Sequence, residues 1–298
     1  MLLTIHTVTY NRAHTLPRTF ESLRAQTCKD FLWLITDDGS TDGTAELVGR
    51  WQSLDSGFPI VYQPIHHGGV PRALNAGVRL CGTDWLMRLD SDDWLRPQAI
   101  ECILSRLPQV ERREEFAGIG FGKCSPDGRW MRGKRPRFDP AAGYVDAANT
   151  QRAEYGLDQD LCEVFRTRLL RRFPFPCWPT ETFAPEQLSH NAIALAGYRL
   201  RWFPEQLCVC EYLPEGLTRN ERIVKENPMG YAMMYNQNLL LCRRFREKLR
   251  CAMQMTALAL YAGEPGYLRR SNCPAATVLS LPLGIVLSLR RRMQYRRL

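Results

Sequence analysis

Residues 89–94 read LDSDDW and place three carboxylates directly after the apolar stretch WLMRL. Asp90 and Asp92 flank Ser91 in an Asp-x-Asp arrangement. Carboxylate oxygens of this kind are ligands for Mg²⁺ or Mn²⁺, which usually share their coordination with substrate phosphates. Asp and Ser are also common in turns, because their side chains hydrogen-bond to nearby backbone groups. Taken alone, the segment is therefore either a metal site or an acidic turn.

Two more polar clusters follow apolar stretches in the same way. Residues 9–12 read TYNR after LLTIHTV, and residues 37–42 read DDGSTD after FLWLIT. In isolation, Asp37, Asp38 and Asp42 could be only turn and helix-cap residues. What they do depends on where the surrounding elements place them.

Strand and helix patterns alternate over the first 107 residues and must position these clusters. Each helical pattern lies between two apolar runs typical of buried strands, which are expected at residues 2–8, 31–36, 60–63 and 85–89. This order predicts an α/β fold with a mainly parallel sheet and flanking helices. Because ligands of such sheets bind beyond the carboxyl ends of the strands, the three polar clusters should converge on one crevice.

The negative charge of this crevice limits the kinds of ligand that it can bind. Carboxylates of DDGSTD and DSDD would repel an anion unless a divalent cation lay between them. Asp90 and Asp92 could hold Mg²⁺ or Mn²⁺, and the cation would in turn hold phosphate groups. We therefore expect the crevice to bind a nucleotide diphosphate.

The second half of the chain is less regular. Residues 117–131 predict a hairpin around Pro-Asp-Gly, and residues 159–175 predict a short amphipathic helix. Another helical pattern follows Glu186, and residues 199–213 read as mostly extended. Trp residues in the apolar runs are expected in the core.

The formal net charge of +9 comes from the C-terminal end. Residues 242–298 hold 12 Lys or Arg against 2 Asp or Glu, a local balance of +10. This placement in one terminal segment argues against nucleic acid as a partner. The eleven cysteines show no CxxC spacing and suit small buried side chains in a reducing cytosol. The N-terminal MLLTIHTVTYN shows no signal-peptide pattern.

The C-terminal segment leaves two interpretations open. Residues 274–289 carry no charge, and five arginines follow in RRRMQYRR. A membrane span needs about 20 apolar residues, so this run is too short. One interpretation is an interfacial segment, residues 274–297, with arginines at anionic headgroups. The other is a helix packed on the catalytic domain with a frayed basic end.

Four motifs in order and in register resemble glycosyltransferase family 2. They are TVTYNRAHTLPRTFESLRAQT, ITDDGSTDGTAEL, GGVPRALNAGV and LDSDDWLRP, and the later EVFRTRLLRRFPFP, ETFAPEQLSHNAIA and CEYLPEGLT resemble a bacterial branch of that family. The resemblance covers about residues 1–240. It implies the Rossmann-like GT-A fold of nucleotide-diphospho-sugar transferases, with a helical basic tail.

The resemblance also implies roles by position. Tyr10 would lie against the base, Asp38 would hold the base or ribose with Asp37 nearby, Asp92 would bind the metal, and Asp90 would face ribose or metal. The expected nucleotide-sugar-binding set is completed by Val8, Asn11, Arg12, Arg72, Asn75 and Ser91. Two departures concern this set. The proline that the family often places before Tyr-Asn is replaced by Val8-Thr9, and the arginine of its Ala-Arg-Asn element is replaced by Leu74, with Arg72 two residues away.

Family members move a sugar to an acceptor hydroxyl with inversion, which requires a base on the face opposite the leaving diphosphate. The resemblance places that catalytic base at Glu186 in APEQL. The family's Glu-Asp pair is replaced here by Pro-Glu, so Glu181 remains a competitor.

Together these features predict a metal-dependent inverting hexosyltransferase with a nucleotide-diphosphate sugar donor, UDP-sugar first among the candidates. The acceptor would be a glycan or a lipid-linked molecule in bacterial polysaccharide synthesis. Residues 1–215 would be the catalytic domain and residues 216–298 a helical extension, with the protein cytoplasmic and peripheral on the inner face of the membrane. The alternatives are a sugar-phosphate nucleotidyltransferase, whose GxGTR element is missing, and a non-catalytic membrane-associated protein with a decayed donor site.

Overall fold

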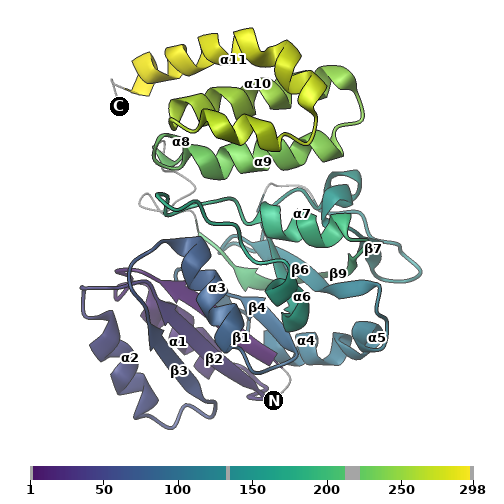
Figure 1. The fold of residues 1–298 in the computed structure, drawn as a ribbon. Coiled ribbons are helices and arrows are strands. Elements are labelled where there is room, and N and C mark those ends of the chain that lie inside the picture. Colours follow the sequence, from purple (N-terminus) through teal and green to yellow (C-terminus); the bar gives the residue numbers. More distant parts are fainter. Residues whose placement is uncertain (1–2, 132–134, 212–221, 296–298) are drawn as a thin grey trace. The chain divides into compact units, whose positions relative to one another are not determined.

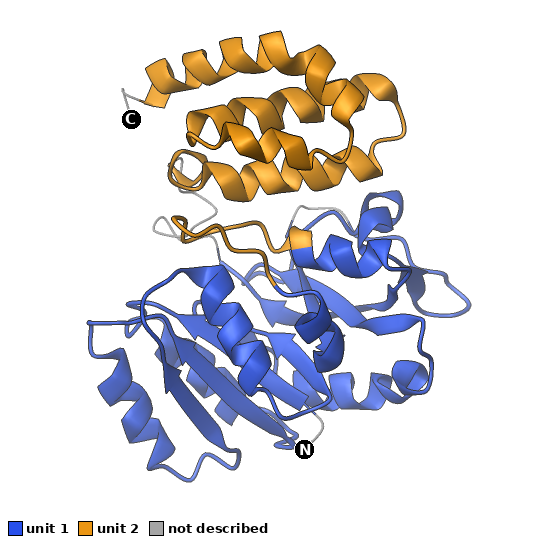
Figure 2. Cartoon of the chain, in the orientation of Figure 1, with its two compact units in different colours: residues 1–174, 189–212 blue, residues 175–188, 213–298 orange. Residues whose placement is uncertain are grey.

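The computed structural model describes residues 3–131, 135–211 and 222–295. The chain forms two compact units, coloured separately in Figure 2: unit 1 comprises residues 1–174 and 189–212, and unit 2 comprises residues 175–188 and 213–298. The expected boundary at residue 215 lies outside the described residues and stays a prediction.

Unit 1 begins with the predicted alternation of strands and helices (Figure 1). Four strands pair in parallel in the order β3-β2-β1-β4: β1 Leu3–Thr9, β2 Phe31–Asp37, β3 Ile60–Pro64 and β4 Trp85–Arg88. The connecting helices are α1 Leu16–Arg24, α2 Thr44–Gln52 and α3 Val70–Leu80. Thr9 pairs with Asp37, so the ends of β1 and β2 lie side by side. The predicted parallel arrangement is confirmed here.

The other strands extend the sheet beyond β4 in mixed directions, in the order β8-β6-β9-β5, with β7 also paired to β9. They are β5 Trp94–Leu95, β6 Phe116–Cys124, β7 Val145–Ala147, β8 Leu161–Arg166 and β9 Arg199–Val209. β9 confirms the expected extended segment. The remaining helices of unit 1 are α4 Ala99–Arg106, α5 Pro108–Glu111, η1 Asn149–Tyr155 and α6 Thr167–Arg172, and α7 Gln187–Leu195 begins in unit 2 and continues into unit 1.

Two expectations in this half differ from the structure. The helix predicted over residues 159–175 is wrong in its first part, because LCEVFR forms β8 and pairs antiparallel with both β4 and β6. Only Thr167–Arg172 is helical there. The hairpin predicted over residues 117–131 is reduced to a turn and one bridge between Cys124 and Trp130, since β6 pairs with β8 and β9 instead.

The core of unit 1 is aromatic and dense. Trp33, Trp85 and Trp202 are fully buried, as expected from their apolar runs. Close packing also requires Gly77 in α3, because a Cβ there would lie 2.1 Å from Nε2 of His6 in β1. His6 is completely buried, its Nε2 lies 3.0 Å from the Thr36 hydroxyl, and burial together with the nearby Arg88 lowers its pKa to about 3. The sheet beneath α3 therefore contains a neutral histidine.

Unit 2 is helical. Its elements are α8 Ile223–Glu226, α9 Pro228–Leu241, α10 Phe245–Tyr261, η3 Pro265–Arg270 and α11 Pro274–Tyr295. α10 lies between α9 and α11 (Figure 1) and supplies much of their shared core. Within the described residues, no helix has both the length and the hydropathy that crossing a membrane requires.

Candidate active site

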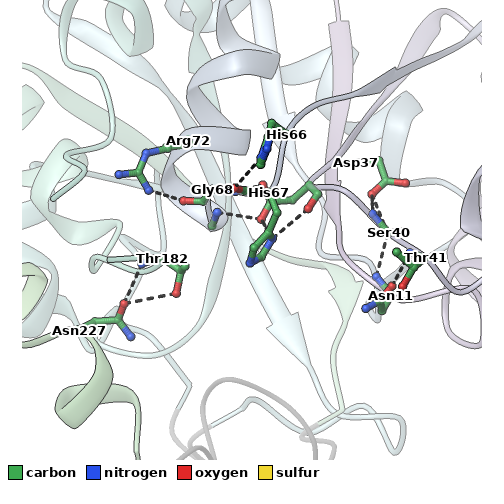
Figure 3. A network of polar contacts seen from close by, with 12 residues as sticks. Asn11, Asp37, Ser40, Thr41, His66, His67, Gly68, Arg72, Thr182 and Asn227 are labelled. Carbon is green, nitrogen blue, oxygen red and sulfur yellow. Dashed lines mark hydrogen bonds and ion pairs between the residues drawn. The ribbon is translucent and has the colours of Figure 1, made fainter. Parts of the chain in front are cut away.

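Asn11 joins the first two polar clusters at the carboxyl edge of the sheet. Its backbone has a positive φ of 52°, its amide donates to the Ser40 hydroxyl at 2.8 Å, and its side-chain oxygen accepts from the Thr41 amide at 2.8 Å (Figure 3). Asn tolerates the left-handed region better than most residues, which explains its use at this point. Hydrogen bonds therefore link TYNR and DDGSTD into one continuous surface, as the sheet topology predicts.

Both carboxylate oxygens of Asp37 accept hydrogen bonds from residues that form that surface. It is 1% exposed, one carboxylate oxygen accepts from the Ser40 amide at 2.8 Å and the Ser40 hydroxyl at 2.6 Å, and the other accepts from the Tyr62 hydroxyl. Charge-assisted bonds of this kind are strong, and together they fix the turn after β2. This is the role of a turn residue.

Asp38 is also committed, but to a different loop. Its two oxygens accept from the amides of Gly68 and Gly69, each at 2.8 Å, and its Oδ2 lies 2.9 Å from Nδ1 of His67. The side chain is buried, so these contacts hold the HHGG loop at the start of α3. The predicted contact of Asp38 with a base or ribose stays a prediction, and any such contact shares the carboxylate with the loop.

His67 lies in the HHGG loop, residues 66–69, and has a defined place there. Its ring stacks on Tyr10, with centroids 4.4 Å apart and an interplanar angle of 25°. Tyr10 remains 45% exposed and so presents a flat surface at the sheet edge. The only sequence signal was that His67 precedes the glycines of a strand-to-helix turn, which marks a loop without marking its neighbours.

The other expected nucleotide-binding residues lie on the same half of unit 1. Val8 is half-buried and lies one residue before the end of β1, Arg12 follows Asn11, and Asn75 lies half-buried in α3. Arg72, displaced by two residues from the family's arginine, donates to the Gly68 carbonyl and so helps to hold the loop. Ser91 is buried.

Two cationic side chains, Lys123 and Arg88, form ion pairs with carboxylates of the LDSDDW segment. Lys123 of β6 lies 3.1 Å from Oδ2 of Asp90 and 2.7 Å from Oδ2 of Asp93, and its side chain is only 12% exposed. Arg88 pairs with the other oxygen of Asp90. Although burial alone would raise it, the charges of Arg88 and Lys123 hold the pKa of Asp90 well below its ordinary value. Asp90 and Asp93 therefore both form ion pairs with cations that the protein supplies, although burial and the charges of Asp90 and Asp92 still raise the pKa of Asp93.

Asp92 differs from its neighbours. Burial and the negative charge of Asp90 raise its pKa, opposed by the nearby charge of Arg12. In the part of the chain that the structure describes, no side chain donates a hydrogen bond to its carboxylate. Its main-chain oxygen accepts from Arg18 at 2.6 Å, which fixes the backbone while leaving the carboxylate accessible to a ligand.

This arrangement fits a divalent cation held by one protein carboxylate. Across the described residues, no group of three or more His, Cys, Asp or Glu side chains is arranged as a metal cage. Mg²⁺ is commonly held by one or two carboxylates, with phosphates and water completing its shell. Because Asp90 and Asp93 are paired with Lys123, Asp92 is the residue that fits this role.

Glu181, the first of the two candidate bases, holds the start of α9 in unit 2. Its two oxygens accept from the amides of Met229 at 2.6 Å and Gly230 at 2.7 Å, and the side chain is buried. Burial raises its pKa, although the two backbone bonds oppose that shift. A carboxylate at this position complements the unpaired amides and the dipole of a helix N-terminus.

The neighbouring segment is fastened to the same helix. Asn227, just before α9, accepts from the amide of Thr182 at 3.0 Å (Figure 3) and from the amide of Phe183 at 2.9 Å. A Cβ on Gly230 would lie 2.6 Å from the Phe183 carbonyl oxygen, so only glycine permits this approach. Glu186 follows a few residues later, half-buried and directly before α7. The structure thus separates the two candidates: Glu181 caps a helix, and Glu186 precedes one.

The fold and the acidic edge define a class of protein in which a parallel α/β sheet carries a nucleotide site beyond its carboxyl ends. The family model for glycosyl transferase family 2 matches residues 4–175, which include every polar cluster of unit 1 described above. The chain belongs to glycosyltransferase family 2, as its motifs predicted.

Similarity to individual relatives extends over about a third of the chain. The chain is 35% identical over 103 residues to the chondroitin synthase of Pasteurella multocida and to that of Escherichia coli. The matched region is 35% of this chain but only 10% and 15% of those relatives. The chain thus spans a small part of the curated relatives it matches.

Similarity to solved structures extends over nearly the whole chain. Residues 1–349 of S. aureus TarS in complex with UDP-GlcNAc superpose with a TM-score of 0.61 at 13% identity, covering 99% of this chain and 92% of that one. The mannosyltransferase PcManGT from Pyrobaculum calidifontis, in complex with GDP-Man and Mn²⁺, gives 0.56 at 19% identity, covering 98% and 82%. At these identities the likeness shows the fold, and the predicted GT-A class is confirmed.

Proposed function

We propose that the protein is a metal-dependent inverting glycosyltransferase that moves a hexosyl group from a nucleotide-diphosphate donor to the hydroxyl of a glycan or lipid-linked acceptor in bacterial polysaccharide synthesis. The observation that carries the proposal is Asp92, a partly buried carboxylate at the carboxyl edge of the sheet to which no side chain among the described residues donates a hydrogen bond. Its two neighbours, Asp90 and Asp93, both have such a partner in Lys123.

The donor would bind along the bonded surface of TYNR, DDGSTD and the HHGG loop. The exposed face of Tyr10, supported from behind by His67, suits stacking of a nucleobase, since aromatic stacking favours offset flat rings. UDP-sugars are the first candidates because the TarS neighbour was solved with UDP-GlcNAc, although PcManGT was solved with GDP-Man.

Mg²⁺ or Mn²⁺ is the proposed cofactor, in keeping with the Mn²⁺ in the PcManGT complex. Asp92 would hold it, with Asp90 kept near the ribose side by Arg88 and Lys123. When bound, the cation would neutralise the charge that develops on the leaving diphosphate, which is stabilisation concentrated in the transition state. Arg12, the charge nearest Asp92 on the TYNR side, would help to hold the anionic donor.

Glu186 is the proposed catalytic base. It would accept the proton of the acceptor hydroxyl as that oxygen forms a bond to the anomeric carbon and the bond from that carbon to the diphosphate oxygen breaks. Attack opposite to the leaving group inverts the anomeric centre. The commitment of both Glu181 oxygens to backbone amides supports Glu186 over its competitor.

Nucleotide binding tests the donor site directly. Thermal unfolding would be followed with UDP, GDP, dTDP and CDP, each with and without Mn²⁺. A ligand at 100 times its dissociation constant adds about 2.7 kcal/mol of stability. We expect one nucleotide to stabilise the protein and Mn²⁺ to increase its effect; failure of all four would contradict the donor site.

In Asp92→Asn the increase in stability from Mn²⁺ should disappear. Retention of that increase would mean that the metal binds elsewhere.

The base assignment has its own pair of variants. Glu186→Gln should lower sugar transfer by about 100-fold or more, within the range typical of general bases, while nucleotide binding remains. Glu181→Gln should act mainly on stability, because it weakens the cap of α9. Full transfer activity in Glu186→Gln, with a loss in Glu181→Gln at unchanged stability, would reverse the assignment.

A further inference from the structure

α11 exposes its large apolar side chains instead of burying them. Seven of them are between 43% and 69% exposed: Val278, Leu279, Leu283, Ile285, Val286, Leu289 and Met293. At 100° per residue these positions occupy roughly 160° of the helix circumference. They therefore form one continuous stripe, which we call the apolar face of α11.

The opposite face of α11 carries small residues. Those buried in the unit are Ala276, Thr277, Ser280, Gly284 and Ser288. Gly284 lies directly on α10, where an added Cβ would come within 2.6 Å of Cγ2 of Thr256. A helix that served only to complete the core would direct its leucines and valines inward. In α11 the side that packs on the unit carries small and polar residues, so the large apolar side chains remain exposed and available to bind another surface.

The charges beside the apolar face have one sign. No Asp or Glu follows Glu264, and the next 34 residues contain seven arginines. Arg269 and Arg270 lie exposed before the helix, and Arg290 and Arg292 lie exposed near its end. The apolar face is thus flanked by arginines at both ends. A contiguous stripe of exposed large apolar side chains is typical of an interaction site.

We propose that the apolar face of α11 docks on an anionic lipid surface, with the helix lying in the plane of the headgroups. The combination of a wide apolar stripe with flanking arginines is that of an interfacial helix, and the helix is not one that could span the membrane. A second copy of this chain is a poorer occupant, because a twofold contact through this face would bring arginines together without any carboxylate to pair them. The inference rests on unit 2 and does not depend on the proposed transfer reaction.

Vesicle flotation tests this docking with the full chain. The probes are vesicles of phosphatidylcholine alone and of phosphatidylcholine with phosphatidylglycerol. We expect flotation with the anionic vesicles, little with the neutral ones, and a decrease at high salt. Replacing both Leu283 and Val286 by Glu should reduce binding about tenfold or more. Arg290→Gln should reduce it by about fivefold, since one basic residue near such a surface contributes about that factor.

A matched control comes from two leucines that are exposed elsewhere. The double variant Leu54→Glu with Leu240→Glu adds the same charge at positions that are each 53% exposed, compared with 63% for Leu283 and Val286. It should float like the unchanged protein. Binding that is unaffected by the α11 variant, or equally lost in the control, would overturn the proposal. So would a dimer in sedimentation that the α11 variant abolishes, in the absence of any vesicle binding. Nucleotide-dependent stabilisation should be the same in all variants, which separates this test from that of the donor site.

Discussion

Two acidic clusters at the same edge of the sheet have nearly the same composition and opposite uses. In DDGSTD, Asp37 and Asp38 direct their oxygens to hydroxyl and amide groups of nearby loops. In DSDD, Asp90 and Asp93 form ion pairs with a buried lysine, whereas among the described residues no side chain donates a hydrogen bond to the Asp92 carboxylate. The carboxylates of the first cluster stabilise the loops at the sheet edge, whereas Asp92 of the second cluster is available to bind a ligand.

The partners of a carboxylate distinguish a residue that stabilises the fold from one that can bind a ligand. A buried carboxylate that accepts several hydrogen bonds stabilises its surroundings. A carboxylate whose pKa is raised by burial and by a like charge is destabilised in its ionised form, and so gains more from an incoming cation. Asp92 is of the second kind.

The largest expected effect comes from removing the counter-ion of the second cluster. Lys123→Met would leave Asp90 and Asp93 near each other without their shared cation. Breaking a buried ion pair on one side typically costs about 3–5 kcal/mol. Urea unfolding at neutral pH should show a loss of this size. Combining it with Asp93→Asn should restore part of the stability; if it restores none, the lysine acts by packing rather than by charge.

The next effect separates function from folding at Asp92. Asp92→Asn should lower sugar transfer by about 100-fold or more, because stabilisation of the leaving group is lost. Its free energy of unfolding should stay the same or rise slightly, since the ionised carboxylate is disfavoured in the fold. Transfer assays and urea unfolding on one preparation check both. A marked loss of stability would mean that Asp92 is a folding residue like Asp38.

Asp38→Asn provides the reverse case. Asn keeps one acceptor oxygen, so one of the amides of Gly68 and Gly69 loses its charge-assisted partner. A loss of about 2 kcal/mol is expected for such a buried bond. The exposed Asp55, which accepts only from the Gly57 amide at 3.2 Å, supplies the control Asp55→Asn, with a change within about 0.5 kcal/mol. Equal losses in the two variants would contradict the special role of Asp38.

The smallest expected effect is a pH dependence of stability that arises from buried His6 and not from the carboxylates at the sheet edge. His6 has its pKa lowered from 6.5 to about 3, so the unfolded chain binds a proton at higher pH than the folded protein does. This contribution to stability is complete above pH 6.5 and falls as the pH decreases. Linkage predicts a loss of about 1 kcal/mol between pH 7 and 5.5.

His6→Gln should remove this part of the pH dependence in urea unfolding, whereas Asp38→Asn and Asp92→Asn should retain it. If either aspartate variant removed it instead, the acid sensitivity would belong to the edge rather than to the interior.

Much of unit 1 could be predicted from local patterns. Buried parallel strands read as continuous apolar runs, so β1, β2 and β4 and the polar clusters at their ends were visible. LCEVFR was not, because six residues of mixed polarity suit a strand or a helix, and the choice depended on pairing with β4 and β6, which are distant in the sequence. His67 and Lys123 were missed for the same reason, since their partners lie about 30 residues away.

Strand periodicity and motif order are local properties, so the family, the fold class and the set of carboxylates in the site could be inferred from the residues alone. How each of those carboxylates is used depends on the folded structure. Asp37 and Asp38 are satisfied by loops, Asp90 by Arg88 and Lys123, and Glu181 by the start of α9. Whether a charge is neutralised depends on what lies within a few ångströms of it, and that is set by strand pairing and packing between residues far apart in the chain.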